Sequence, residues 1–279
     1  MLGWIARGLR RGRVTTRYPR RAEQPADGFR GRVEVLEPAL GDAEMAAICP
    51  TGAIEVDGEE CVRLDRGRCI LCGACVEAFP GHFGFAQGED AYETAARTRG
   101  GLVVGDVETN REEPVREALG RQVRALRRSI HIRHLDAGSD GAEEWEIQSL
   151  TNPHHDIQRL GLYFTASPRH ADVLLVTGGV TGPMREPLLR AWEVMPEPKA
   201  LVAVGTDACS GGLAATAGWV AGGVDRVLPV DVYVPGSPPA PIAILHGLLL
   251  AVGLIAEDGR GNFPPHRDGK SPRGTRGAR

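Results

Sequence analysis

Three closely spaced cysteines are the residues of this sequence best suited to chemistry. Cys69, Cys72 and Cys75 have the spacing C-x2-C-x2-C, and Pro80 follows the last of them by five residues. Thiolates at this spacing are typical ligands of a [4Fe–4S] cluster, in which a fourth cysteine directly precedes the proline. Phe79 occupies that fourth position here. A cluster therefore needs one thiolate from elsewhere in the chain.

A second and incomplete ligand run lies upstream, where Cys49 is followed by the sequence PTGAI. Counting back from Cys49 by the same spacing, the first three ligand positions are Ala39, Asp42 and Met45. In ferredoxins with two clusters, the fourth cysteine of each run ligates the other cluster. The surviving cysteines therefore complete one cluster and leave the other without ligands. The predicted ligands of a single [4Fe–4S] cluster are Cys49, Cys69, Cys72 and Cys75.

The composition is that of an ordinary globular protein, with 279 residues, 42% hydrophobic residues and a net charge of −3. It carries no signature of nucleic-acid binding. The N-terminus has no apolar stretch typical of an export signal, so we expect a reducing, cytoplasmic compartment. The most hydrophobic run, residues 242–256, is too short to span a bilayer. Any membrane association is therefore expected to be peripheral or through partner subunits.

The first half of the chain divides into two predicted segments. Residues 1–35 form a basic extension, which is either a short amphipathic helix on an anionic membrane face or acidic partner, or a solvated terminus. Residues 36–100 form a small ferredoxin-like α+β domain, with strands at 53–56 and 62–64 and a closing helix at 91–98. Cys61 lies outside both ligand runs and is expected to be a small buried side chain.

The second half is predicted to be an α/β domain. Residues 101–129 form a linker and a connecting helix, whose acidic start and basic end match the helix dipole. Residues 130–258 alternate strands with helices, which predicts a flavodoxin-like parallel sheet covered on both faces. Residues 259–279 form a disordered tail. The expected strands are 130–135, 161–165, 172–177, 200–205 and 224–229, and the expected helices are 144–150, 183–193, 213–220 and 240–255.

Both halves resemble components of one kind of complex. The first hundred residues resemble the two-cluster ferredoxin subunit of respiratory complex I and of membrane-bound (group 4) [NiFe] hydrogenases, through RVTTRYP at 13–19, FRG at 29–31 and the cysteine runs. The C-terminal half resembles the hydrogenase small subunit and the B-type, 20 kDa-like subunit of complex I. That likeness includes IHIRHLDAG at 130–138, LTNP at 150–153 and PVDVYVPG at 229–236. The chain therefore resembles a fusion of two neighbouring electron-transfer subunits.

The resemblance fails at the ligands of the family's terminal cluster. In the family, four cysteines hold a second [4Fe–4S] cluster, whereas this chain carries oxygen-bearing side chains at all four positions, and Cys209 lies two residues out of register. Because iron–sulfur clusters are held by thiolates, we expect no cluster there. The four positions are Asp140, Glu143, Asp207 and Ser237.

Three interpretations of this second site remain open. Its oxygen atoms suit a divalent cation such as Mg²⁺. Its carboxyl groups also suit a proton relay with raised pKa values. On spacing alone we favour the simplest interpretation, in which lost ligands drifted to polar residues around a closed or water-filled cavity.

The resemblance implies an electron-transfer subunit with one [4Fe–4S] cluster, in a membrane-associated complex I-like or energy-converting hydrogenase-related oxidoreductase. The implied partners are a hydrogenase large subunit-like or complex I 49-kDa-like subunit, together with membrane subunits, on the inner face of the cell membrane. The alternative is a structural or redox-regulatory scaffold without through electron transfer.

No catalytic residue is predicted. Adjacent side chains such as His154 and His155 point apart, so they cannot chelate one ion without a turn and are expected to face a partner. For His131, His134 and His170 we expect packing or hydrogen-bonding roles.

Overall fold

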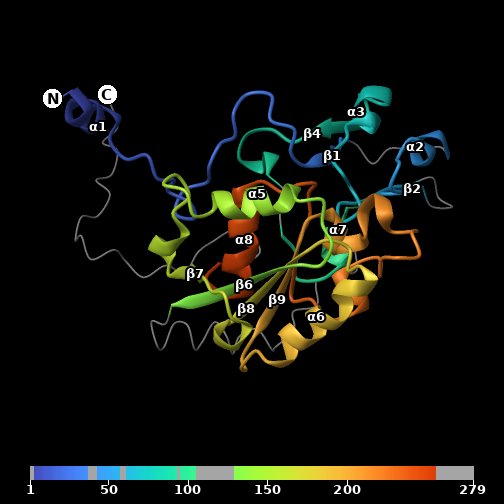
Figure 1. The fold of residues 1–279 in the computed structure, drawn as a ribbon. Helices are drawn as coiled ribbons and strands as arrows, with labels where there is room; N and C mark the ends of the chain where they lie inside the picture. The colour runs from blue at the N-terminus through green and yellow to red at the C-terminus, as the bar shows by residue number, and fades with distance from the viewer. Residues whose placement is uncertain (1–2, 37–42, 57–60, 93–94, 105–128, 256–279) are drawn as a thin grey trace, which may run out of the picture.

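The computed structural model describes residues 3–36, 43–56, 61–92, 95–104 and 129–255 (Figure 1). Its larger unit is built around a five-stranded parallel sheet with the strand order β10-β9-β8-β6-β7. The strands are β6 (Ile130–Asp136), β7 (Leu162–Phe164), β8 (Val173–Thr177), β9 (Ala200–Val204) and β10 (Val232–Val234). The predicted flavodoxin-like architecture is confirmed.

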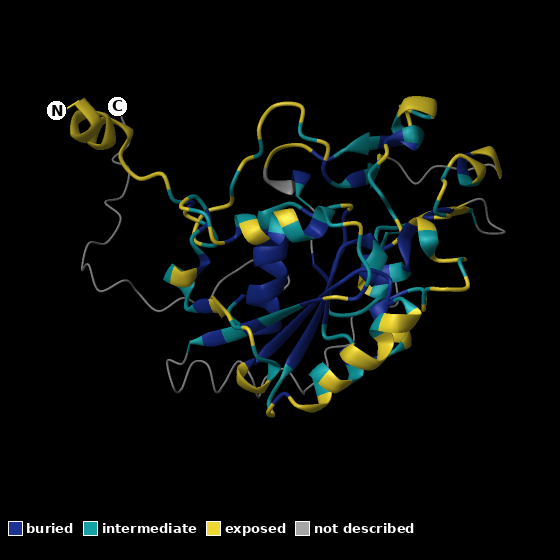
Figure 2. Cartoon of the chain, in the orientation of Figure 1, coloured by how far each residue is buried: buried dark blue, intermediate teal, exposed yellow. Residues whose placement is uncertain are grey.

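Helices cover both faces of this sheet. Helices α5 (Ala142–Ser149) and α8 (Pro241–Ala251) pack on one face, while α6 (Gly182–Glu193) and α7 (Thr206–Ser210) pack on the other. Strands β8 and β9 are therefore buried along their whole length, which explains their uninterrupted apolar sequences. Figure 2 shows that α8 is buried like the strands on which it packs.

The smaller unit consists of two antiparallel sheets and two short helices. Strand β1 (Val33–Val35) pairs with β4 (Phe83–Phe85), and the second sheet has the order β2-β3-β5. Its strands are β2 (Ile54–Val56), β3 (Val62–Asp65) and β5 (Val103–Val104). Helices α2 (Ala43–Ala47) and α3 (Ala74–Ala78) complete the unit around its own hydrophobic core. The two strands predicted for this region are confirmed, and β5 extends the small sheet past residue 100.

The predicted closing helix at 91–98 is wrong for the described residues of that segment. A short 3-10 helix, Gly88–Ala91, ends where the helix was expected to begin. Ala96 instead pairs with Tyr233, because each backbone N–H donates to the carbonyl oxygen of the other residue, at 3.0 and 2.8 Å. The segment therefore extends the edge of the large sheet, a long-range pairing that local sequence cannot reveal.

Two elements of the larger unit also differ from expectation. The segment predicted as a strand at 224–229 begins with a 3-10 helix, Val224–Arg226, and the fifth strand is β10. The apolar residues of the segment 224–229 have helical rather than alternating spacing, as Val224, Val227 and Leu228 show. The helix predicted at 213–220 is replaced by a 3-10 turn, Gly212–Ala214, while α7 forms directly after β9.

An N-terminal strap, defined as residues 13–23, packs on the larger unit. The Thr16 N–H donates to the His154 carbonyl at 2.7 Å, and the Arg159 guanidinium donates to the Tyr18 carbonyl at 2.6 Å. His154 also lies 2.6 Å from a carboxylate oxygen of Glu23. The expectation that these histidines face a partner is wrong for His155, which is buried, while His154 binds the strap of its own chain.

The described residues also contain helix α1 (Gly3–Arg11) and several further 3-10 helices. Helix α1 has no buried residue and lies away from the parallel sheet (Figure 1). The remaining 3-10 helices are Gly100–Leu102, Ile157–Leu160 and Pro168–His170. Among the helices of the described residues, none combines the length and apolarity needed to cross a bilayer. The connecting helix predicted within 101–129 and the tail predicted at 259–279 fall outside the described residues.

The strap contains a partly buried pair, Tyr18 with His246, that can be tested. The hydroxyl of Tyr18 lies 2.6 Å from Nδ1 of His246 on α8, and the other ring nitrogen of His246 has no partner among the described residues. We expect Tyr18→Phe to lower the free energy of unfolding by about 1–2 kcal/mol, because it leaves the buried imidazole without its hydrogen bond. Chemical denaturation measures this loss. Tyr163→Phe is the matched control, since Tyr163 is partly exposed, and an equal effect of both variants would contradict the prediction.

Candidate cluster-binding site

The four predicted ligand cysteines surround one hollow in the smaller unit. Cys49, Cys69, Cys72 and Cys75 all line it, together with apolar residues that include Val33 and Leu64. Cys75 is buried, Cys49 and Cys69 are half-buried, Cys72 is exposed, and none is in a disulfide. The structure thus brings the isolated upstream cysteine to the same place as the three-cysteine run.

Backbone conformation turns the three-cysteine loop around the hollow. Leu71 and Gly73 both have positive φ angles, 56° and 81°, and helix α3 begins directly after Gly73. A leucine in the left-handed region is uncommon, and such strain persists only where the surrounding structure imposes it. The curled loop places its three cysteines in the lining of one hollow.

An ion pair holds the base of this loop. Asp65, the last residue of β3, accepts hydrogen bonds from both terminal nitrogens of Arg99 at 2.6 Å and from the Gly67 N–H at 2.9 Å. Bidentate pairs of this kind fix orientation as well as contributing energy. The sequence reasoning did not single out either partner, because they are far apart in the chain and become neighbours only in the fold.

The residues around the hollow fit a [4Fe–4S] cluster. The Ala53 N–H donates to Sγ of Cys49 at 3.2 Å, a type of hydrogen bond that tunes cluster potentials. Burial raises the pKa of the Cys75 thiol, and the nearby Cys72 and Cys49 sulfurs add to the effect. Four cysteines in a partly apolar hollow provide the soft ligand set that iron–sulfur clusters need. A site for a single metal ion is a different case: among the described residues, no group of three His, Cys, Asp or Glu side chains has the arrangement for one.

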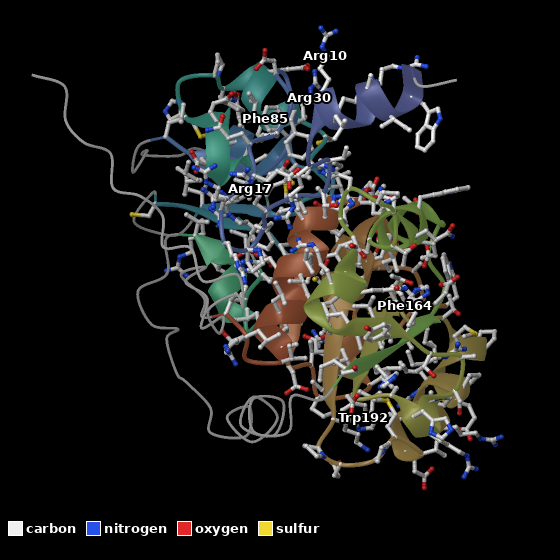
Figure 3. The ribbon with its side chains drawn as sticks, turned by 90° about the vertical axis from the view of Figure 1, so that its left-hand side faces the viewer. Arg10, Arg17, Arg30, Phe85, Phe164 and Trp192 are labelled. Carbon is white, nitrogen blue, oxygen red and sulfur yellow. The ribbon has the colours of Figure 1, made fainter. Side chains whose placement is uncertain are left out.

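A cationic side chain lies beside the loop. The Arg30 guanidinium lies over the Phe85 ring, 5.9 Å from its centroid, and Figure 3 shows the two side chains near each other. Both also approach Gly73, where an added Cβ would lie 3.2 Å from the ring and 3.8 Å from the guanidinium. The loop therefore has a positive charge close to its backbone.

We expect Arg30→Ala to lower the reduction potential of the bound cluster, by on the order of 10 mV because the guanidinium is solvated. Removing a positive charge destabilises the more negative, reduced state. A redox titration followed by electron paramagnetic resonance measures the change. Arg10→Ala, on the exposed helix α1, should leave the potential unchanged, and an equal shift in both variants would contradict the prediction.

The four replaced positions of the second site differ in their environments. Glu143 is 2% exposed, Asp207 is half-buried, and Asp140 and Ser237 are exposed. They lie on the α5 N-terminus, on α7 and in the loops before α5 and after β10. Among the described residues, no group of three acidic or other metal-binding side chains has the arrangement of a single-ion site, which disfavours the divalent-cation interpretation, one of the three left open.

Glu143 is the unusual member of this group. One carboxylate oxygen lies against the backbone of Gly205, where an added Cβ would approach it to 2.5 Å, and the other is buried without a hydrogen-bond partner among the described residues. Burial raises the pKa of Glu143 to about 7, and the negative charges of Asp207, Asp140 and Glu144 add to this. Its carboxyl group therefore changes protonation state near neutral pH.

The neighbouring Glu144 has the opposite environment. It accepts hydrogen bonds from the hydroxyls of Thr177 at 2.5 Å and Ser139 at 2.8 Å, and one of its oxygens lies 3.4 Å from Nε2 of His134. Glu143 and Glu144 are therefore adjacent in the sequence but differ in hydrogen bonding, because Glu144 has hydroxyl donors whereas Oε2 of Glu143 has no partner among the described residues.

The other two cysteines lie outside the hollow. Cys61 is exposed and directly precedes β3, so the expectation that it is a small buried side chain is wrong. Cys209 is buried on α7, two residues after Asp207. Neither of them lines the hollow, unlike the four cysteines of the predicted ligand set.

Comparison with known proteins supports the composite nature of the chain. Residues 141–251 match the family of the NADH ubiquinone oxidoreductase 20 kDa subunit, and residues 62–120 match a 4Fe-4S single cluster domain. A probable membrane-bound hydrogenase subunit, mbhJ of Pyrococcus furiosus, is 40% identical over 138 residues, which are 50% of this chain and 83% of that protein. The chain belongs to the 20 kDa subunit family.

Other relatives of this 20 kDa family member are longer than the matched region. Formate hydrogenlyase subunit 7 of Escherichia coli is 42% identical over 135 residues. These residues are 48% of this chain and 53% of that protein, so the chain spans about half the length of this relative. The B-type subunit of the NADH-quinone oxidoreductase of Citrifermentans bemidjiense is 49% identical over 40% of this chain and 66% of its own length. A chain from the structure of a membrane-bound sulfane sulfur reductase matches 48% of this chain with 29% identity and a TM-score of 0.43.

The single-cluster match agrees with only part of the predicted ligand set. Residues 62–120 contain Cys69, Cys72 and Cys75, whereas Cys49 lies outside the matched range. The assignment of Cys49 as the fourth ligand therefore depends on the convergence of the four side chains around the hollow.

The raised pKa of Glu143 has a consequence for stability. Its ordinary value is 4.5 and its folded value is about 7, so the folded protein binds more protons than the unfolded chain between these values. Stability consequently falls as the pH rises through this range. We expect the stability advantage of Glu143→Gln over the wild type to grow by about 1–3 kcal/mol between pH 5 and pH 8.

Denaturation curves at several pH values test this prediction. Glu186→Gln is a suitable control, since Glu186 is an exposed residue of α6 paired with Arg190. A difference between Glu143→Gln and the wild type that does not change with pH would contradict it.

Proposed function

We propose that this protein is a one-electron relay subunit with a single [4Fe–4S] cluster, held by Cys49, Cys69, Cys72 and Cys75. The observation that carries the proposal is the convergence of these cysteines around one hollow, in a chain whose other half belongs to the 20 kDa subunit family. The cluster supplies one-electron chemistry. The protein positions it, shields it on one side and sets its potential through hydrogen bonds and nearby charge.

The proposed complex is a membrane-associated oxidoreductase related to complex I and to energy-converting hydrogenases. Support comes from relatives that are named as subunits of a membrane-bound hydrogenase, a formate hydrogenlyase and an NADH-quinone oxidoreductase. The small unit, assigned to residues 36–100, carries the cluster, and the unit at 130–258 docks on a large subunit like that of hydrogenases or the 49-kDa subunit of complex I. The chain then lies peripherally on the inner face of the membrane.

Exposed apolar side chains support docking near the second site. Trp145 on α5 is 72% exposed, and Leu213 and Trp219, which follow α7, are 67% and 62% exposed. Large apolar side chains that are left exposed favour a protein interface. Since these residues adjoin α5 and α7, which carry Glu143 and Asp207, this surface suits the proposed large subunit.

The second candidate function is a structural or redox-regulatory scaffold. One observation favours it, since none of the four terminal ligand positions is a cysteine and the usual last carrier of the family is lost. In this role the cluster would stabilise the protein or sense the redox state, and it would pass no electrons on to an acceptor.

Cys72→Ser separates these two functions. Loss of one thiolate should remove the electron paramagnetic resonance signal of the reduced cluster, and a relay should then lose at least about tenfold in turnover while the complex still assembles. The control is Cys61→Ser, because Cys61 is exposed and lies outside the hollow. Full turnover of an assembled Cys72→Ser complex would refute the relay, and an iron-free wild-type protein would refute the cluster itself.

A further inference from the structure

The second site contains a buried acid with an unsatisfied atom. Glu143 is almost fully shielded from solvent, and its Oε2 has no hydrogen-bond partner in the described residues. A buried carboxylate without partners is costly, whereas the protonated acid is far less so. The close approach to Gly205, which has a φ of 92°, fixes the carboxyl group in this position.

Two further acids with different exposure act electrostatically on this group. Asp140 is exposed, Asp207 is half-buried and Glu143 is buried, and the charges of the two aspartates both act on Glu143. The remaining charged neighbour, Glu144, is held by Thr177 and Ser139 and lies near His134. Asp140 and Asp207 are therefore the proton-exchanging side chains that act on Glu143, and Asp140 is in contact with solvent.

A direct contact joins this acid site to the cluster loop. The hydroxyl of Thr206 donates to the carbonyl oxygen of Cys69 at 2.8 Å. Thr206 is fully buried, and its chain neighbours are Gly205, which touches Glu143, and Asp207, which acts on it electrostatically. The buried Thr206 thus links the segment that contacts Glu143 to the loop of Cys69, and electrostatic interactions are stronger at buried positions than in water.

From this arrangement we infer that Glu143 is a proton-binding site linked to the cluster: one proton binds to its carboxylate when the cluster is reduced and leaves when the cluster is oxidised. The electron comes from a low-potential one-electron donor, and the cluster accepts it without a bond being formed or broken. The proton comes from solvent through Asp140 and Asp207, and it forms one O–H bond on the Glu143 carboxylate. The added negative charge is therefore balanced. This inference builds on the proposed relay function.

A redox titration of the cluster-loaded full chain between pH 6 and pH 8.5 tests the linkage. We expect reduction to raise the proton affinity of Glu143 at least tenfold, which for a one-electron couple is a change of about 59 mV in midpoint potential between the acidic and alkaline limits. Glu143→Gln should abolish this pH dependence. Asp207→Asn should keep it but move it to lower pH, because a negative neighbour of Glu143 is removed.

Infrared difference spectroscopy supplies a second readout that does not depend on activity. Reduction of the wild type should produce a band of a protonated carboxylic acid, and this band should be missing in Glu143→Gln. Glu186→Gln, on the exposed face of α6, should retain both the band and the pH dependence.

The possible failures are distinguishable. A protein with an intact reduced-cluster signal, but with a potential that does not change with pH or changes equally in Glu143→Gln, would overturn the proton linkage alone. A protein that binds no iron would overturn the relay function and the linkage together.

Discussion

The contact between the loop of Cys69 and the first turn of α7 is the constraint on which the rest of the structure depends. The Thr206 hydroxyl binds the Cys69 carbonyl, so a proposed cluster ligand of the small unit is fixed against the carboxyl end of the large parallel sheet. The Asp65–Arg99 ion pair holds the same loop from the other side. Without both contacts, the curled backbone around Leu71 and Gly73 would lack the support that its positive φ angles require.

The remaining contacts between the two units reinforce this placement. Ala96 extends the sheet next to Tyr233, and the N-terminal strap binds the larger unit through Thr16 and Tyr18. These contacts come from segments on both sides of the cluster run. They hold the small unit in a defined position, which an electron carrier needs because transfer rates fall steeply with distance. The strap sequence at 13–19 thus has a structural role that its residue types alone did not explain.

Sequence reasoning succeeded where the signal was local. The fully apolar strands β8 and β9 predict a covered parallel sheet, and cysteine spacing identifies the ligand run around Cys72. It failed where distant segments decide the conformation, as at Ala96, whose partner is Tyr233. The second site shows both outcomes. The register of Glu143 could be read from the sequence, whereas its missing hydrogen-bond partner and its contact with Gly205 exist only in the fold.

The environment of Glu143 also favours one of the three interpretations of the second site. A divalent cation needs several ionised oxygens at one point, but Asp140 is exposed, whereas Glu143 is buried and its pKa is raised to about 7. Simple drift to polar residues explains Ser237, which is exposed, but it does not explain why a buried position carries an ionisable group at a substantial cost. A carboxyl group that changes protonation state near neutral pH accounts for the burial, the unpaired oxygen and the neighbouring charges together. In this interpretation the second site, which has no cysteine at any of its four positions, is suited to binding a proton rather than an iron–sulfur cluster.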